Sequence, residues 1–172
     1  MRFKVLITVV GGLLATATVA EADQIAALLT GYEETPAAVS TTGTGVFTAT
    51  IDHDGDTIFY TVTYSGLQAS VTQSHIHVGQ LGVTGSVVIF LCQTGGSPDP
   101  TGLAPACPQQ GSVAGTITAA NVIAGATASQ QLTAGDIAAV VAAIRAGAAY
   151  ANVHTTLSPG GEIRGQIRTI AK

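Results

Sequence analysis

Residues 71–79 (VTQSHIHVG) contain a His-x-His pair, His75 and His77, which accounts for two of the four histidines in the chain. Neutral imidazole is a common ligand for copper and zinc. A third histidine, His154 in YANVHTT, would complete a three-nitrogen set that leaves one coordination position open for water or substrate. The alternative is that these side chains lie on a solvated sheet face or form hydrogen bonds that fix strand register.

Strand alternation indicates which side chains could meet these histidines. Residues i and i+2 of a strand point to the same face. Each of the three expected strands 71–78, 150–156 and 162–169 therefore has one polar and one apolar face. The last two segments are expected to pair, because the link TTLSPGGE is rich in turn residues. If all three are neighbours, the histidines converge. The polar faces carry Gln73, His75 and His77; Tyr150, Asn152 and His154; and Glu162, Arg164, Gln166 and Arg168.

We therefore predict that His75, His77 and His154 could hold copper or zinc, with Glu162 as a candidate fourth ligand. Side chains around the ligands would orient them through hydrogen bonds. The candidates for this role are Gln73, Tyr150, Asn152 and Arg164.

Other reactive groups give weaker indications, and we predict no catalytic residue. Ser74 adjoins His75 but points to the opposite strand face, and no Gly-x-Ser-x-Gly pattern occurs. The run DHDGD at 52–56 alternates acidic residues as a calcium loop does, but it lacks the later glutamate, so a turn is favoured. Glu34 follows Glu33 in an expected bend and could form a salt bridge with Arg164.

Short segments rich in Thr, Val and Ile, separated by Gly, Asp and Pro, predict a mainly β protein: an antiparallel, Greek-key-like sandwich or barrel. The clearest hairpin is GTGVFTATIDHDGDTIFYTVTYSGL, in which Asp54-Gly55 supplies the turn. The segment SVVIFL is apolar on both faces, which favours a central strand. The other expected strands are 24–29, 71–78, 112–119, 150–156 and 162–169.

One segment has the period of a helix. In LTAGDIAAVVAAIRAGAA, apolar residues recur at i, i+3, i+4 and i+7, which predicts one amphipathic helix near residues 134–146, before the penultimate strand. Thr133, with Asp136 three residues later, is the expected N-cap, and Gly147 is the expected stop.

The first 22 residues are predicted to be a signal peptide. Arg2 and Lys4 precede an apolar run that ends at Ala20-Glu21-Ala22, a small-residue cleavage pattern. Residues 23–172 would form one domain of ordinary size with no membrane span in the mature chain. The protein is therefore expected to be secreted or periplasmic.

The composition of the chain argues against a nucleic-acid partner. Beyond residue 22 the chain has four basic and nine acidic residues, and it lacks the clustered Lys and Arg of a nucleic-acid binder. The only cysteines, Cys92 and Cys107, would meet an oxidising compartment after export, which favours a disulfide. Two thiolate metal ligands are the alternative, but the loop between them offers no further ligand.

SHIHVGQLGVTGSVVIFL and the later YANVHTTLSPGGEIRGQI together resemble the chordin-type domain, the CHRD family, and LLTGYEETPAAVSTTGTG is similar to the opening of that family. The resemblance runs from about Ala26 to Ile167. It implies a β-rich extracellular module that occurs alone in bacterial secreted proteins. It does not imply growth-factor antagonism, which belongs to a multidomain animal protein.

Two functions follow from these features. The first is an exported module that binds a protein or small ligand and carries the three-histidine site. The second is a redox enzyme with superoxide-dismutase-like chemistry, similar to that copper enzyme in having His-x-His, a distant histidine and a later arginine on a β fold. The chain lacks a bridging histidine and an acidic zinc-site cluster, so the non-enzymatic function is favoured.

Overall fold

The computed structural model describes residues 22–95 and 99–171. The predicted signal peptide lies outside the described residues, except for residue 22. The described strands are β1 (Asp23–Thr30), β2 (Thr44–Ile51), β3 (Ile58–Ser65), β4 (Val71–Val78), β5 (Ser86–Gln93), β6 (Gly111–Ile117), β7 (Ala149–Thr155), β8 (Ile163–Gln166) and β9 (Arg168–Ala171). The described helices are α1 (Ile137–Arg145) and three 3-10 turns, η1 (Gly31–Glu33), η2 (Ala119–Asn121) and η3 (Ala128–Gln130).

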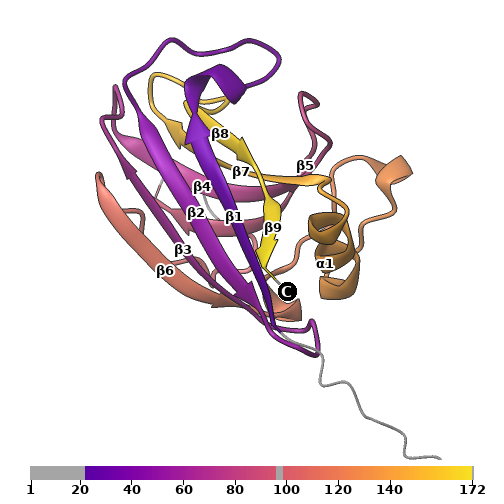
Figure 1. The fold of residues 1–172 in the computed structure, drawn as a ribbon. Coiled ribbons are helices and arrows are strands. Elements are labelled where there is room, and N and C mark those ends of the chain that lie inside the picture. Colours follow the sequence, from indigo (N-terminus) through magenta and orange to yellow (C-terminus); the bar gives the residue numbers. More distant parts are fainter. Residues whose placement is uncertain (1–21, 96–98, 172) are drawn as a thin grey trace, which may run out of the picture.

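The strands form an antiparallel, nearly closed barrel, so the predicted fold class is confirmed (Figure 1). The strand order is β5-β4-β7-β8-β1-β2-β3-β6. β8 and β9 pair with different parts of β1. Together, β8 and β9 therefore take one of the eight strand positions around the barrel. The expected single strand 162–169 is therefore two strands separated at Ile167, and α1 precedes the third strand from the end.

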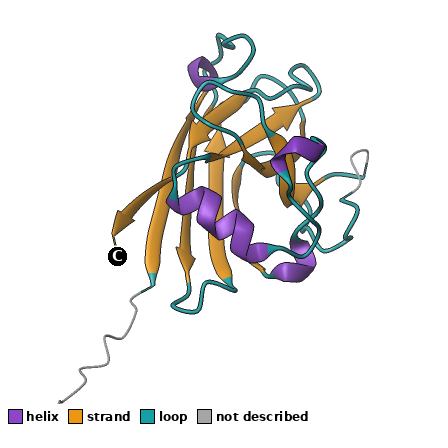
Figure 2. Ribbon diagram, turned by 90° about the vertical axis from the view of Figure 1, so that its right-hand side faces the viewer, coloured by secondary structure: helices purple, strands orange, loops and turns teal. Residues whose placement is uncertain are grey.

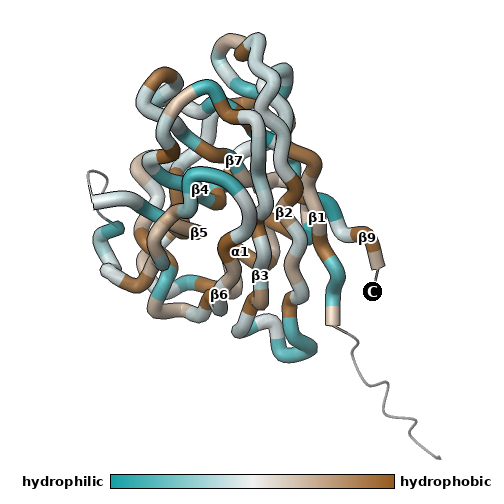
Figure 3. The backbone as a smooth tube through the Cα atoms, turned by 90° about the vertical axis from the view of Figure 1, so that its left-hand side faces the viewer, coloured by the Kyte–Doolittle hydropathy of each residue, from teal (hydrophilic) through white to brown (hydrophobic). Residues whose placement is uncertain are grey.

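Buried and more exposed residues alternate along β1, β2 and β3, which form one wall of the barrel. Phe47, Ala49 and Ile51 of β2 are buried in the core, whereas the residues between them are more exposed. Hydrophobic and more hydrophilic residues alternate along these strands (Figure 3). One side of this wall therefore faces the core, as the sequence pattern predicted.

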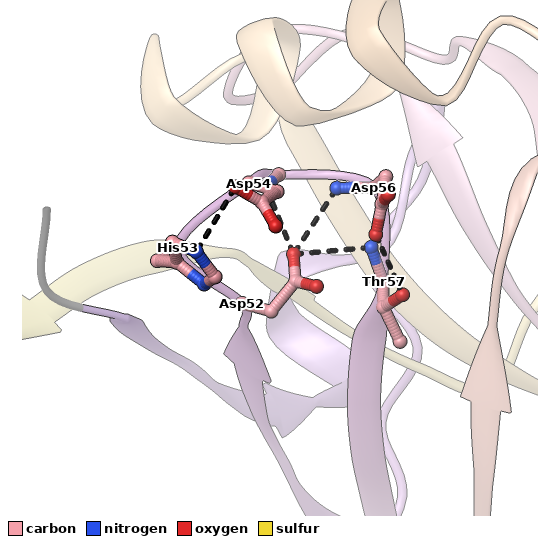
Figure 4. A network of polar contacts seen from close by, with 6 residues as sticks. Asp52, His53, Asp54, Asp56 and Thr57 are labelled. Atoms are coloured by element: carbon pink, nitrogen blue, oxygen red, sulfur yellow. Dashed lines mark hydrogen bonds and ion pairs between the residues drawn. The ribbon is translucent and has the colours of Figure 1, made fainter.

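The β2–β3 turn is the predicted hairpin turn (Figure 4). Asp52 Oδ1 accepts hydrogen bonds from the backbone N–H groups of Gly55, Asp56 and Thr57 at 2.8, 3.1 and 3.2 Å. Gly55 has φ +74°, a conformation that glycine adopts without steric cost. The carboxylate of Asp52 thus organises the turn backbone, as the turn interpretation of DHDGD requires.

The apolar segment SVVIFL is not a central strand. β5 ends the strand order and faces β6 across the seam of the barrel. It is apolar on both sides because a later segment covers it: Ile123 N–H donates to the Val88 carbonyl at 2.9 Å, and Ser86 Oγ donates to Gln130 Oε1 at 2.6 Å. The expected Cys92–Cys107 disulfide is present at the end of this strand, with 4.9 Å between its Cα atoms.

Helix α1 packs against the strands (Figure 2) and contributes Ile137, Val140, Val141 and Ile144 to the same hydrophobic core. Its N-cap is Asp136, not Thr133, because the Asp136 carboxylate accepts the Ala139 N–H at 2.9 Å. Gly147 follows the helix with φ +67°, as predicted. In the described part of the chain, no helix has the length and hydrophobicity needed to cross a membrane.

Candidate metal centre

β4 and β7 are adjacent antiparallel strands, and this pairing brings the three histidines together. His75 lies opposite Asn152, His77 opposite Tyr150, and Gln73 opposite His154. The alternate residues of these strands, such as Ile76 and Val153, belong to the hydrophobic core. The histidines therefore occupy the opposite face of the sheet, which points away from that core.

This outward face is not solvated. The exposed fractions of His75, His77 and His154 are 2, 7 and 6%. Loop backbone covers the face and binds its polar side chains: Gln166 Nε2 donates to the carbonyls of Gly79 and Gly147 at 3.0 and 2.8 Å. The interpretation that these histidines lie on a solvated sheet face is therefore wrong.

The candidate ligand nitrogens of His75, His77 and His154, one from each side chain, lie within 4.8 Å of one another. His75 Nδ1 is 3.1 Å from His154 Nε2. The ring centroids of His75 and His77 are 5.5 Å apart, and those of His75 and His154 are 4.8 Å apart. The three imidazoles thus form one compact cluster, to which neither Cys92 nor Cys107 contributes.

Two backbone carbonyls fix the orientation of two of the rings. His77 Nδ1 is 3.0 Å from the Gly85 carbonyl, and His154 Nδ1 is 2.9 Å from the Pro159 carbonyl. A carbonyl oxygen only accepts, so each Nδ1 carries the proton and each Nε2 presents a lone pair. Histidine ligands of metals are commonly held in this way.

The same reasoning assigns the proton of His75. Because His154 Nε2 is an acceptor, His75 Nδ1 must donate to it, which leaves His75 Nε2 with a lone pair. His75 Nε2 and His77 Nε2 are both buried with no hydrogen-bond partner among the described residues. The cluster therefore holds two buried lone pairs that no donor in the described part of the chain satisfies.

Burial also determines the charge of these rings. Desolvation lowers the pKa of His75 to about 2, and the neighbouring His154 and His77 act in the same direction. Desolvation lowers the pKa of His77 to about 4 and also lowers the pKa of His154. All three imidazoles are therefore neutral at neutral pH, the form in which histidine binds metals.

Aromatic and cationic groups surround the cluster. Tyr150 stacks on His77 with ring centroids 4.6 Å apart and an interplanar angle of 11°. Arg164 Cζ lies 3.5 Å from the centroid of the same tyrosine ring. Phe90 of β5 packs edge-on against His75 at 4.4 Å. Sequence reasoning did not select Phe90, because strand alternation gave no sign that β5 pairs with β4.

Gly85 is a second residue that the sequence did not single out. Its carbonyl orients His77, and a Cβ at this position would lie 1.9 Å from the Val78 carbonyl oxygen. Only glycine allows the loop backbone to approach β4 so closely. The glycine-rich link between β4 and β5 was the one available signal.

Glu162 lies apart from the histidine ligands. One of its oxygens accepts from Thr41 Oγ1 at 2.6 Å and from the Gln68 N–H at 2.8 Å, and the other accepts from Thr155 Oγ1 at 2.8 Å. The group of mutually close ligand atoms contains the three histidines without Glu162. Its carboxylate instead ties the β7–β8 link to distant loops. Gln73, a predicted neighbour of the ligands, lies opposite His154 in the strand register.

Arg164 does not form the expected salt bridge with Glu34. The ion pairs found among the described residues are His53–Asp54 and Arg145–Asp23. The Arg164 guanidinium instead donates to Thr35 Oγ1 and to the carbonyls of Gln80 and Val83, the latter at 2.9 Å. These groups occupy its two terminal nitrogens, whereas the buried Nε has no hydrogen-bond partner among the described residues.

Glu34 is buried next to the same loops, and its Oε1 has no hydrogen-bond partner among the described residues. A Cβ on Gly161 would lie 2.5 Å from this oxygen. Burial raises the pKa of Glu34 to about 7, while Arg164 and the Thr35 N–H oppose the rise. This carboxyl is therefore largely protonated below neutral pH.

Comparison with known proteins gives one family. A family model described as the CHRD domain matches residues 25–167. The matched range includes the three histidines and Arg164. No curated protein and no solved structure gives a significant match to the chain.

Proposed function

We propose that this chain, which belongs to the CHRD domain family, is an exported module that binds one copper or zinc ion through His75, His77 and His154. One observation carries the proposal: the three buried imidazoles present candidate ligand nitrogens within 4.8 Å of one another. Imidazole suits both metals, and three histidines are an established ligand set for a zinc ion.

The two unsatisfied lone pairs support metal binding over a purely structural role. Histidines that only fix strand register would be expected to pair both ring nitrogens when buried. Here His75 Nε2 and His77 Nε2 lack partners among the described residues, and leaving a buried polar atom unpaired costs about 1–3 kcal/mol. A cation coordinated by these nitrogens would remove that cost.

The size of the cluster fits a metal ion after a small adjustment. Nitrogen ligands lie about 2.0–2.1 Å from zinc, so two ligands of one ion are at most about 4.2 Å apart. The 4.8 Å limit of the cluster is slightly wider. Binding would therefore need a modest rotation of at least one ring and loss of the hydrogen bond between His75 and His154.

Export is part of the same proposal. The Cys92–Cys107 disulfide fits an oxidising compartment, and residues 1–22 have the pattern of a signal peptide. Intact-mass measurement of the protein recovered outside the cytoplasm should give a chain that begins near Asp23. A secreted form that retains Met1 would contradict this part of the proposal.

The test is metal titration of the folded protein with copper and with zinc. We expect one ion per chain, and we expect His77→Ala and His154→Ala to lose this binding. The chain offers a matched control in His53→Ala, because His53 is an exposed histidine of the β2–β3 turn. This variant should bind as the parent does.

Circular dichroism spectra and unfolding midpoints would show that each variant is folded. Equal binding by the parent, His77→Ala and His154→Ala would refute the three-histidine site. Loss of binding in His53→Ala would do so as well. His77→Gln and His154→Gln, which keep a polar side chain, replace any alanine variant that fails to fold.

A further inference from the structure

Within the described ranges, no negatively charged ligand belongs to the histidine cluster. Its three ligands are neutral, and none of the buried carboxyls belongs to the group of mutually close ligand atoms. Three of them have other partners: Asp23 pairs with Arg145, Asp99 binds backbone of its own loop, and Glu162 accepts from three other groups. A bound cation would therefore keep its whole charge in a buried site.

A buried cation lies close to the cluster. Arg164 is 1% exposed and lies over the ring of Tyr150, which also stacks on His77. It has no carboxylate within 4 Å among residues 22–95 and 99–171. Its two terminal nitrogens donate to neutral oxygens, so its positive charge is not cancelled by a direct ion pair. The neighbouring Glu34 is largely protonated below pH 7.

These charges discriminate between metal ions. The cost of moving an ion from water into a low-dielectric interior rises with the square of its charge, so a divalent ion costs roughly four times as much as a monovalent one. The repulsion between the ion and Arg164 is also twice as large for a divalent ion as for a monovalent one. Three-histidine zinc sites keep an open position for water, but the nitrogens here are closed off from solvent.

Resting on the proposed metal-binding function, we infer that the cluster of His75, His77 and His154 selects monovalent copper over Cu(II) and Zn(II). A cation of single charge needs no anionic ligand, and three coordinating nitrogens satisfy it without a bound water. The protein would then hold Cu(I) in an exported compartment.

One side chain offers an isosteric test of the charge argument. Asn152 is 2% exposed and lies opposite His75 in the strand register, and no described residue forms a hydrogen bond with its Oδ1. Asn152→Asp keeps the shape of this side chain and adds one negative charge beside the cluster. A charge about 5 Å from the ion, at an effective dielectric constant near 20, should favour a divalent over a monovalent ion by about 300-fold.

The experiment measures the dissociation constants of the three ions at pH 6. Cu(I) is measured by competition with bathocuproine disulfonate, with ascorbate present and oxygen excluded. Zn(II) and Cu(II) are measured by competition with coloured chelators. We expect Cu(I) to bind the parent at least about 100-fold more tightly than Zn(II). In Asn152→Asp this ratio should fall by about 300-fold. The control is Asn121→Asp, which makes the same change in η2. There the side-chain oxygen accepts only from Thr118. The ratio of Cu(I) to Zn(II) affinity in this variant should equal that of the parent.

The outcomes separate this inference from the proposed function. Binding of none of the three ions would refute the function itself. Binding of Zn(II) or Cu(II) as tightly as Cu(I) by the parent would refute the selectivity while the three-histidine site stands, and that result does not depend on any variant. An unchanged ratio in a folded Asn152→Asp protein would refute the charge argument.

Discussion

Glu34 gives a stability prediction that can be worked out from its burial. Its pKa rises from an ordinary value of 4.5 to about 7 in the folded protein, chiefly through desolvation. A group whose pKa is higher in the folded state contributes stability that is complete below the unfolded pKa and is lost as pH rises through the folded pKa. The window for Glu34 is therefore about pH 4.5 to 7.

The size of the effect follows from the shift. Each pKa unit corresponds to about 1.4 kcal/mol, so ionisation of Glu34 should lower the free energy of unfolding by about 3 kcal/mol between pH 4.5 and pH 8. Glutamine resembles the protonated acid in shape and never ionises. Glu34→Gln should therefore match the parent near pH 4.5 and exceed its free energy of unfolding by about 3 kcal/mol at pH 8.

The assay is urea unfolding followed by circular dichroism at pH 4.5, 6, 7 and 8, with a chelator present to remove metal. Other groups titrate in this range, and they cancel in the difference between the parent and Glu34→Gln. The exposed neighbour Glu33 supplies the control, because Glu33→Gln removes the same charge from a solvated position. A difference between the parent and Glu34→Gln that is the same at pH 4.5 and pH 8 would show that Glu34 ionises normally.

Three further outcomes are expected. Replacing Cys92 and Cys107 by alanine should lower the free energy of unfolding by about 3 kcal/mol, since their bond closes a loop with a sequence separation of 15; urea unfolding of oxidised and reduced parent checks this, and equal midpoints would contradict it. Asp136→Ala should cost about 1 kcal/mol by removing the N-cap of α1, and an unchanged thermal midpoint would exclude the cap's contribution. The pKa of His75 is lowered to about 2, so the metal-free protein should lose stability as pH falls below 6.5, because the unfolded chain takes up a proton that folded His75 does not. His75→Gln should reduce this loss by about 2 kcal/mol at pH 5, and an identical pH dependence would show that His75 is not buried in its neutral form.

Local sequence patterns predicted much of the barrel. Alternation of apolar and polar residues along β2 and β3, with Asp54-Gly55 between them, is a short-range signal, and the structure has the hairpin where it was expected. The helix signal was equally local. The end of the chain was harder to predict, since the break at Ile167 depends on how β8 and β9 share β1. The position of β5 at the seam depends on the segment that covers it.

The sequence by itself determined that His75 and His77 share a face and that His154 has a compatible one, because side chains alternate with a period of two on any strand. The tertiary structure decided that β4 and β7 are neighbours, although the histidines they bring together are 79 residues apart. It also decided that Gly85 and Pro159 cover and orient them, and that the Glu162 carboxylate binds other loops. Alternation is fixed by each residue's neighbours in the chain, whereas pairing and burial depend on contacts between segments that no local pattern specifies.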